Sequence, residues 1–236
     1  MKRYVTLLVA AAVTFCLTAC GNERSDVLGG SEAGQESSTM QNAEDMPEAS
    51  ASSQAADGKI LIAYFTAAEN SGVDAVSSAS YSVVNETAVG RLRAIADMIQ
   101  SETGGELFSI QTSVVYPTDG RELIDYAAQE QEEDARPELS SHIESLDEYG
   151  TIFVGYPNWW ADLPQVLYSF FDEYDFSGKT IIPFNVHNGS RFSGTIETIQ
   201  ELEPEATVIK DGFTVNEKDV PEAAGDVADW LDEIGY

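Results

Sequence analysis

Residues 151–160, with the sequence TIFVGYPNWW, carry the strongest indication of the fold. Their first six residues form a short apolar run, which is typical of a strand buried on both faces of a sheet. The same reasoning predicts further strands at residues 60–65, 107–112, 180–185 and 206–209. Each predicted strand is short, and none shows the strict alternation of a half-exposed strand. The sequence therefore predicts a sheet that is covered on both sides.

Helical segments separate these strands. Residues 163–174 are an example, because their apolar side chains recur at the spacing of one helix face. Helices are predicted at residues 87–101, 121–134, 163–174, 194–201 and 220–234. Alternating strands and helices with buried strands indicate an α/β fold with a doubly wound parallel sheet. In such sheets ligands bind beyond the carboxyl ends of the strands, so the loops that leave the strands are the candidate sites.

The first of these loops follows residue 65. Thr66 stands at the strand exit, and Asn85-Glu86-Thr87 is predicted to open the next helix. The start of a helix presents unpaired amide groups and the positive end of the helix dipole, which favour a phosphate. Hydroxyl groups add donors without adding charge. The alternative is that Asn85 or Thr87 only caps the helix.

Two further loops carry aromatic and polar groups. Residues 157–164 read PNWWADLP, and adjacent Trp159 and Trp160 cannot both point into the sheet, so at least one is expected near the surface. An indole face suits stacking against a flat heterocycle, although both rings could instead pack on helices. Residues 185–190 read NVHNGS, a pattern that suits the polar edge of a heterocycle or an ordinary surface turn.

The N-terminal region has the features of an export signal. Lys2 and Arg3 precede an apolar run that is too short to span a bilayer, and the run ends in Leu-Thr-Ala-Cys-Gly at residues 17–21. This order resembles the lipobox of bacterial lipoproteins, in which Cys20 is acylated and becomes the mature N-terminus. We expect residues 1–19 to be the signal peptide and residues 58–236 to be the folded domain. Residues 20–57, rich in Ser, Glu and Ala, are expected to be a disordered tether.

Charge and cysteine content narrow the function. The formal net charge is −29, which argues against nucleic-acid binding and against electrostatic adhesion to anionic lipid. A membrane contact would then depend on the lipid anchor alone. Both cysteines lie within the first 20 residues, so we expect no disulfide and no thiolate metal site in the domain. The chain has only two histidines, so we expect no metal centre. Separately, we expect the protein to be a monomer.

Three stretches together carry a family resemblance. Residues 60–66, residues 151–160, and residues 176–184 followed by His187-Asn188-Gly189-Ser190 resemble the flavodoxin-like family, in particular a branch of lipoproteins from anaerobic Firmicutes. The resemblance covers about residues 59–236. It implies a five-stranded parallel sheet of order 2-1-3-4-5, in three α/β/α layers, and non-covalent flavin mononucleotide (FMN) as cofactor.

The resemblance also implies the residues of the site. By this likeness Thr66, Asn85, Glu86 and Thr87 hold the phosphate, and Pro157, Asn158, Trp159, Trp160, Asn185, His187, Asn188 and Gly189 flank the isoalloxazine ring.

The phosphate loop departs from the family pattern, because residues 67–84 interrupt it. A second alignment places Asn70 and Ser71 at the phosphate, and the sequence does not choose between the two. Within the insert, residues 74–80 (DAVSSAS) resemble the acceptor sequence of bacterial flavin transferases, which link FMN through its phosphate to a hydroxyl, here that of Ser80.

The sequence thus leaves three functions open. The first is an FMN-dependent electron carrier or reductase outside the cytoplasm, acting on a redox partner protein or a small-molecule acceptor. The second is an FMN-dependent quinone or NAD(P)H reductase, and the third is a flavodoxin-fold binding module that has lost FMN. The fold alone does not separate them.

Overall fold

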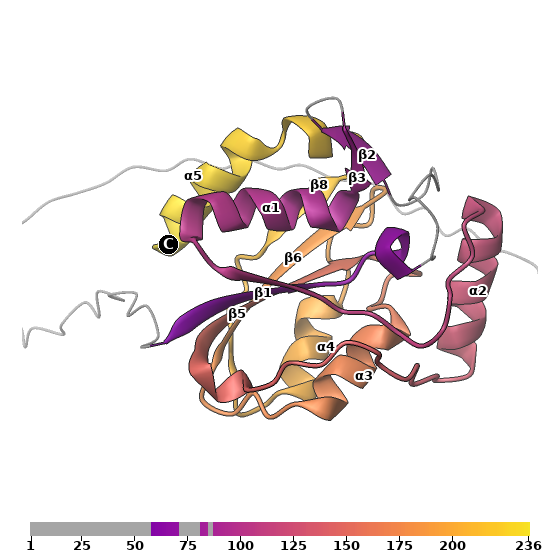
Figure 1. Ribbon diagram of the computed structural model, residues 1–236, viewed down its shortest axis with the longest axis horizontal. Coiled ribbons are helices and arrows are strands. Elements are labelled where there is room, and N and C mark those ends of the chain that lie inside the picture. The colour runs from indigo at the N-terminus through magenta and orange to yellow at the C-terminus, as the bar shows by residue number, and fades with distance from the viewer. Residues whose placement is uncertain (1–57, 71–80, 85–86) are drawn as a thin grey trace, which may run out of the picture. The chain divides into compact units, whose positions relative to one another are not determined.

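The computed structural model describes residues 58–70, 81–84 and 87–236, drawn in colour in Figure 1. The expected signal peptide, Cys20 and the tether lie outside these residues, as do Ser80, Asn85 and Glu86. The central sheet is built from β1 (Lys59–Tyr64), β4 (Glu106–Ser109), β5 (Tyr149–Pro157), β6 (Thr180–His187), β7 (Thr207–Val208) and β8 (Phe213–Asn216).

The strand order confirms the predicted fold class. The strands lie in the order β4-β1-β5-β6-β7, with β8 also paired to β6, and every pairing in this sheet is parallel. Counting β7 and β8 as two parts of one strand, this is the order 2-1-3-4-5.

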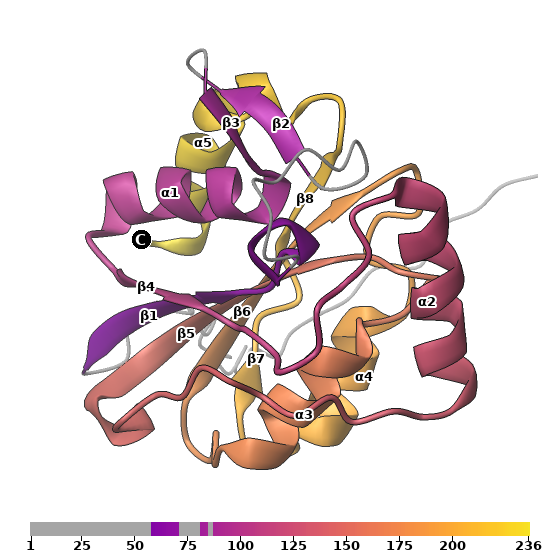
Figure 2. The ribbon, with the colours of Figure 1, turned by 45° about the vertical axis from the view of Figure 1, so that its right-hand side comes forward.

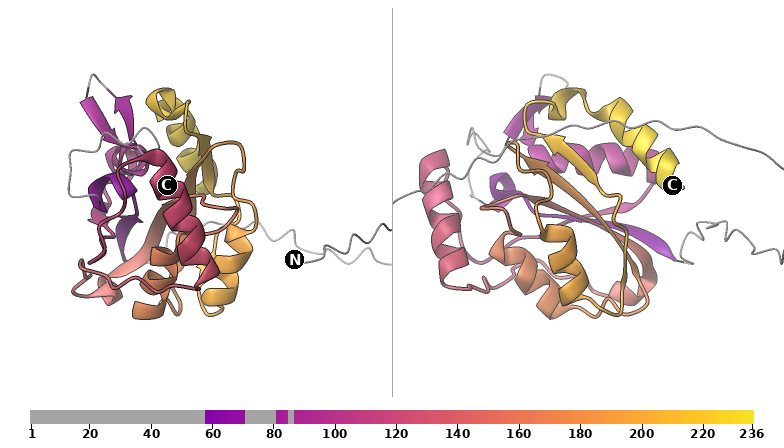
Figure 3. Two further views of the ribbon diagram at one scale, coloured as in Figure 1. Left: turned by 90° about the vertical axis from the view of Figure 1, so that its right-hand side faces the viewer. Right: turned by 180° about the vertical axis from the view of Figure 1, so that it is seen from behind.

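Helices cover both faces of the sheet. They are α1 (Arg91–Thr103), α2 (Gly120–Glu132), α3 (Gln165–Glu173), α4 (Thr195–Leu202) and α5 (Ala224–Ile234), with short 3-10 turns η1 (Ala67–Asn70), η2 (Leu146–Glu148) and η3 (Val220–Glu222). Figure 2 and the right panel of Figure 3 show α1 and α5 on one face and α3 and α4 on the other.

Strand alternation divides the core between the two faces. In β1, Ile62 and Tyr64 join the cluster under α1 and α5, whereas Leu61 and Ala63 join the cluster under α3 and α4. All four side chains are buried, which explains why the strand reads as an unbroken apolar run.

The last strand is interrupted opposite Pro183. β7 pairs with Thr180 and Ile181, and β8 pairs with residues 184–187, so the edge of β6 is unpaired between them. At this edge of β6, the backbone carbonyls of Ile181 and His187 accept hydrogen bonds. Backbone groups of every second residue in a strand face the same neighbour, so the backbone nitrogen of Pro183 also faces this edge. Proline has no N–H to donate, which accounts for the break. The sequence-based strand at residues 206–209 therefore covered only the first half, and β8 was missed.

The first helix begins later than predicted. Thr87 belongs to β3 (Thr87–Gly90), which pairs antiparallel with β2 (Tyr81–Val84), and α1 starts at Arg91. The prediction that Thr87 opens the helix is therefore wrong, because backbone pairing with β2 extends the chain as far as Gly90. Gly90 is the N-cap residue, and a Cβ there would lie 2.8 Å from Oγ1 of Thr66. The lack of a side chain at Gly90 thus lets the helix start approach the exit of β1.

Candidate functional site

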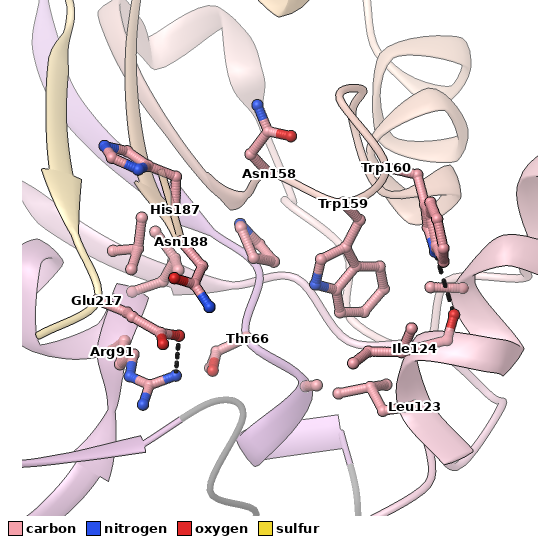
Figure 4. Close-up of a pocket in the computed structure, with 15 residues that line it drawn as sticks. Thr66, Arg91, Leu123, Ile124, Asn158, Trp159, Trp160, His187, Asn188 and Glu217 are labelled. Atoms are coloured by element: carbon pink, nitrogen blue, oxygen red, sulfur yellow. Dashed lines mark hydrogen bonds and ion pairs between the residues drawn. The ribbon is translucent and has the colours of Figure 1, made fainter. Parts of the chain in front are cut away.

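A cavity of about 310 Å³ opens at the carboxyl ends of β1, β5 and β6. This volume lies in the range of small-molecule sites, about 300–1,000 Å³. The cavity lies where β1 has β4 on one side and β5 on the other, which is the point at which the strand order reverses. Figure 4 shows the side chains that line it, contributed by segments far apart in the sequence.

One end of the cavity is aromatic and apolar. It is lined by Leu123, Ile124 and Ala127 of α2 and by Trp159 and Trp160. The ring of Trp159 meets the ring of Phe65 edge-on at 5.5 Å and that of Tyr116 at 5.8 Å. Trp160 is 57% exposed, and its Nε1 donates to the carbonyl of Ile124 at 3.1 Å. The prediction that one tryptophan lies near the surface is confirmed.

A tight turn separates the two indoles. Trp159 and Asp162 exchange both backbone hydrogen bonds, at 3.0 and 3.1 Å, and the residues between them have positive φ, 52° at Trp160 and 65° at Ala161. This is the pattern of a type I′ turn, which usually requires glycine or asparagine. The left-handed backbone at two non-glycine residues is strained, and such strain is concentrated at functional sites. Here it directs Trp159 toward Phe65 and Trp160 toward α2 (Figure 4).

The other end of the cavity is polar. Thr66, Arg91 and Glu217 line it, and Nη1 of Arg91 lies 2.9 Å from Oε2 of Glu217. Their side chains are only 13% and 23% exposed, so the pair is largely shielded from solvent. Arg91 is the first residue of α1, whose N-cap, Gly90, makes no side-chain capping bond. The amide groups at the start of α1 are therefore directed at the same end of the cavity as Arg91.

His187 and Asn188 also line the cavity, on the side of Arg91 and Glu217 (Figure 4). Nδ1 of His187 accepts a hydrogen bond from the backbone N–H of Gly189 at 2.8 Å, so this nitrogen is unprotonated. Burial, together with the charge of Arg191, lowers the pKa of His187. At neutral pH His187 is therefore uncharged and carries its proton on Nε2.

Many of the predicted site residues come together at this cavity. Those that line it are Thr66, Pro157, Asn158, Trp159, Trp160, His187 and Asn188. Asn85 and Glu86 lie outside the described residues, as does the Ser80 acceptor, and Thr87 lies in β3, four residues before the helix start.

Asn70 and Asn185 have structural roles. Asn70 does not line the cavity; its Nδ2 donates to the carbonyls of Thr66 and Ile110, and its Oδ1 accepts from the N–H of Thr112. Its amide therefore ties the exit of β1 to the exit of β4.

Asn185 is fully buried and likewise absent from the cavity wall. Its Nδ2 donates to the carbonyl of Arg191 at 2.8 Å, a carbonyl that also accepts from Nδ2 of Asn158 at 2.7 Å. The two amides fix the loop after β6. Gly189, also outside the cavity wall, acts through its bond to His187.

The sequence reading missed Arg91, Glu217 and the three apolar residues of α2. Arg91 was placed inside a helix rather than at its start. Glu217 follows β8, which the sequence did not reveal. The sequence predicts a helix at residues 121–134 but not its neighbours, and only the fold brings Leu123, Ile124 and Ala127 beside Trp159 and Trp160.

A buried carboxyl group lies behind the aromatic end. Glu130 of α2 is 6% exposed, and both of its oxygens lie within reach of the hydroxyl of Tyr116, at 3.2 and 3.3 Å. Burial raises the pKa of Glu130 to about 7, and the bond from Tyr116 offsets part of that rise. Because Tyr116 also contacts Trp159, the carboxyl group is one side chain away from the cavity wall.

The described part of the chain shows neither a cluster of metal ligands nor a helix suited to crossing a membrane. Residues 58–70, 81–84 and 87–236 contain no group of three His, Cys, Asp or Glu side chains that could hold a metal ion. No helix in the same ranges is long and apolar enough to cross a membrane.

A parallel sheet of order 2-1-3-4-5, with a ligand-sized cavity where the order reverses, defines the flavodoxin-like class of doubly wound domains. The chain belongs to the flavodoxin family, because the family model described as flavodoxin matches residues 76–234. The family predicted from the sequence is thereby confirmed. No curated protein gives a significant match.

Solved structures agree on the fold. A protein from Bacteroides uniformis classed as a flavoprotein is 26% identical with a TM-score of 0.58, covering 74% of this chain and 98% of its own. A second protein classed as a flavoprotein, from Bacteroides eggerthii, is 24% identical with a TM-score of 0.57. The match covers 76% of this chain and 99% of the Bacteroides eggerthii chain. A flavoprotein from Lactobacillus acidophilus, solved in complex with FMN, is 17% identical with a TM-score of 0.50, covering 70% and 97%.

Proposed function

We propose that this protein is an FMN-binding electron-transfer protein or reductase, held at the outer face of the cytoplasmic membrane by a lipid on Cys20. The observation that carries the FMN assignment is the polarity of the cavity. It has an aromatic end at Trp159 and Trp160 and a polar, cation-containing end at Thr66 and Arg91. FMN has the same asymmetry, with a flat ring system at one end and a phosphate at the other. Family membership and the FMN complex of the Lactobacillus acidophilus flavoprotein support this assignment.

The phosphate end offers three kinds of donor. Thr66 supplies a hydroxyl without adding charge, Arg91 supplies a planar cation, and the start of α1 supplies backbone amides. Each suits a phosphate oxygen, and guanidinium groups bind such oxygens in pairs. The chain's own residues thus hold the phosphate and orient the rest of the ligand across the cavity.

The aromatic end positions and shields the ring. Trp159 is held by Phe65 and Tyr116, so its place at the cavity wall is fixed before the ligand enters. Trp160 stands at the mouth, anchored to α2 through Ile124. When bound, FMN supplies the redox chemistry, while the protein orients it and sets the local charge. A net charge of −29 opposes the addition of electrons, which lowers the reduction potential of the bound ligand.

We expect the purified full-length protein to bind one equivalent of FMN, with a shifted visible spectrum and quenched flavin fluorescence. Trp160→Ala should weaken FMN binding by about 1–3 kcal/mol, because it removes aromatic area from the mouth of the cavity. Trp159→Ala should weaken it similarly and also lower the stability of the fold. Fluorescence titration measures both effects.

A matched control is Val115→Ala, which truncates an exposed apolar side chain that does not line the cavity. Its FMN affinity should equal that of the wild type. A protein that binds no FMN would favour the binding-module alternative. Equal affinities in both tryptophan variants and the wild type would place the ring elsewhere.

The attachment of FMN is tested on protein isolated from its native membrane. Mass spectrometry after denaturation should show the flavin still on the chain if Ser80 is the acceptor, and Ser80→Ala should then remove it. Complete release of flavin on denaturation would mean non-covalent binding, as the flavodoxin-like resemblance implies.

The membrane anchor is tested by Cys20→Ser. We expect this variant either to leave the membrane fraction or to stay unprocessed, because its only acylation site is lost and its charge repels anionic lipid. Fractionation followed by N-terminal sequencing of the product distinguishes the two. Fully processed Cys20→Ser protein that stays with the membrane would contradict the lipoprotein assignment.

A further inference from the structure

The polar end of the cavity, where we propose that the phosphate binds, already contains an ion pair between Arg91 and Glu217. Among the described residues that line the cavity, Arg91 is the only Lys or Arg and Glu217 is the only Asp or Glu. The two residues are 126 positions apart in the chain, yet Nη1 of Arg91 and Oε2 of Glu217 are 2.9 Å apart. The one basic side chain that the described residues contribute to the cavity wall is thus paired with the one acidic side chain that they contribute (Figure 4).

The fold holds both partners in place. Glu217 directly follows β8, and its backbone N–H donates to the carbonyl of His187 at 2.8 Å, which fixes where its side chain begins. Arg91 starts α1, and its Nε lies 3.4 Å from Oγ of Ser82 in β2. Because both side chains are mostly shielded, the attraction between them is stronger than in an exposed pair.

A phosphate at this end requires the same guanidinium group. Thr66 and the amides of α1 are uncharged donors, so Arg91 is the only full positive charge that the described residues offer at the cavity wall. A flavin phosphate carries between one and two negative charges at neutral pH, and it would meet both the neutralised Arg91 and the carboxylate of Glu217. Like charges in a shielded site repel strongly.

We infer that Glu217 is an internal competitor for Arg91, and that its carboxylate limits the preference of this protein for phosphorylated over unphosphorylated flavin. The inference rests on the proposed function, because it concerns the same cavity and ligand. When the phosphate enters, the guanidinium group exchanges the carboxylate for phosphate oxygens, and Glu217 turns away. Riboflavin has the ring but no phosphate, so its binding leaves the ion pair intact.

The test compares FMN with riboflavin on the full-length protein. Glu217→Gln should bind FMN about tenfold more tightly than the wild type does, which corresponds to about 1.4 kcal/mol. Its affinity for riboflavin should equal that of the wild type. Arg91→Gln should bind FMN no more tightly than riboflavin.

Glu148→Gln is the matched control. It removes the same charge from another carboxylate paired with a basic side chain, that of Lys59 at the first residue of β1, far from the carboxyl ends of the strands. Its affinity for both flavins should equal that of the wild type. An equal gain for FMN in Glu148→Gln would mean that net charge, not Glu217, is responsible.

A measurement without flavin separates this inference from the proposed function. Thermal unfolding in potassium phosphate is compared with potassium chloride at equal ionic strength. Phosphate should raise the midpoint of Glu217→Gln by about 2–4 °C, for about 1 kcal/mol of stabilisation, and leave the wild type unchanged. If this shift occurs but neither flavin binds, the competition stands and the FMN assignment fails. If Glu217→Gln gains neither FMN affinity nor phosphate stabilisation, the competition is overturned.

Discussion

Replacing Gly155 by alanine is expected to lower the free energy of unfolding by about 3 kcal/mol, the upper part of the range for overpacked cores. Gly155 lies in β5, opposite Phe184 of β6. A Cβ at Gly155 would lie 2.1 Å from Cζ and 2.3 Å from Cε2 of the Phe184 ring, far inside van der Waals contact. Phe184 is fully buried, so the ring cannot move aside without displacing its neighbours in the core.

The consequence extends to the site, because Gly155 precedes Pro157 at the cavity wall by two residues. We therefore expect Gly155→Ala to lose FMN affinity together with stability. Urea unfolding, followed by tryptophan fluorescence, measures the stability, and flavin titration measures the affinity.

Gly225→Ala provides the opposite control. Gly225 lies in the first turn of α5, and a Cβ there would meet no atom within 4 Å. Alanine should stabilise this helix by about 0.5–1 kcal/mol, since glycine is the poorer helix former. If the two substitutions had equal effects, the contact between Gly155 and Phe184 would not govern the packing of the sheet.

The second large effect is expected from the buried carboxyl group of Glu130. Its pKa is about 7 in the folded protein, against an ordinary value of 4.5. At a pH between these two pKa values, Glu130 is ionised in the unfolded chain but protonated in the folded protein. The unfolded state therefore binds fewer protons, and the free energy of unfolding falls as pH rises. One pKa unit corresponds to about 1.4 kcal/mol, so the loss approaches about 3 kcal/mol above pH 7.

Glu130→Gln should remove this loss, because the amide is uncharged and can still accept a hydrogen bond from Tyr116. We expect the variant to exceed the wild type by about 2–3 kcal/mol at pH 8 and to match it near pH 4. Urea unfolding at a series of pH values measures the difference. Glu203, whose pKa burial also raises to about 7, leaves a residual slope in both proteins.

Glu132→Gln on the same helix is the control, because Glu132 is exposed. It should leave the pH dependence unchanged. A constant difference between Glu130→Gln and the wild type at every pH would show that Glu130 is not held protonated by burial.

Because Tyr116 contacts Trp159, the titration of Glu130 should also be visible as a change in tryptophan fluorescence near pH 7.

The sequence by itself determined the fold class and much of the site. Apolar runs such as residues 151–156 and 60–65 identify doubly covered strands, since a strand buried on both faces has no polar side. The geometry of parallel sheets then predicts that the strand-exit loops lie together, and the structure places Thr66, Trp159 and His187 on the wall of one cavity. Those inferences succeed because each depends on a local pattern and one general rule of topology.

The remaining features depend on contacts between distant segments, and only the tertiary structure decided them. Helix α1 begins at Arg91 because the preceding residues pair with β2 as strand β3, and local helix propensity does not predict this pairing. Glu217 reaches Arg91 because β8 resumes pairing with β6 beyond Pro183, a register that no local pattern encodes. The pKa of Glu130 rises because α2 buries it against Tyr116. Burial and charge pairing are properties of the assembled neighbours, so a residue's own sequence context does not specify them.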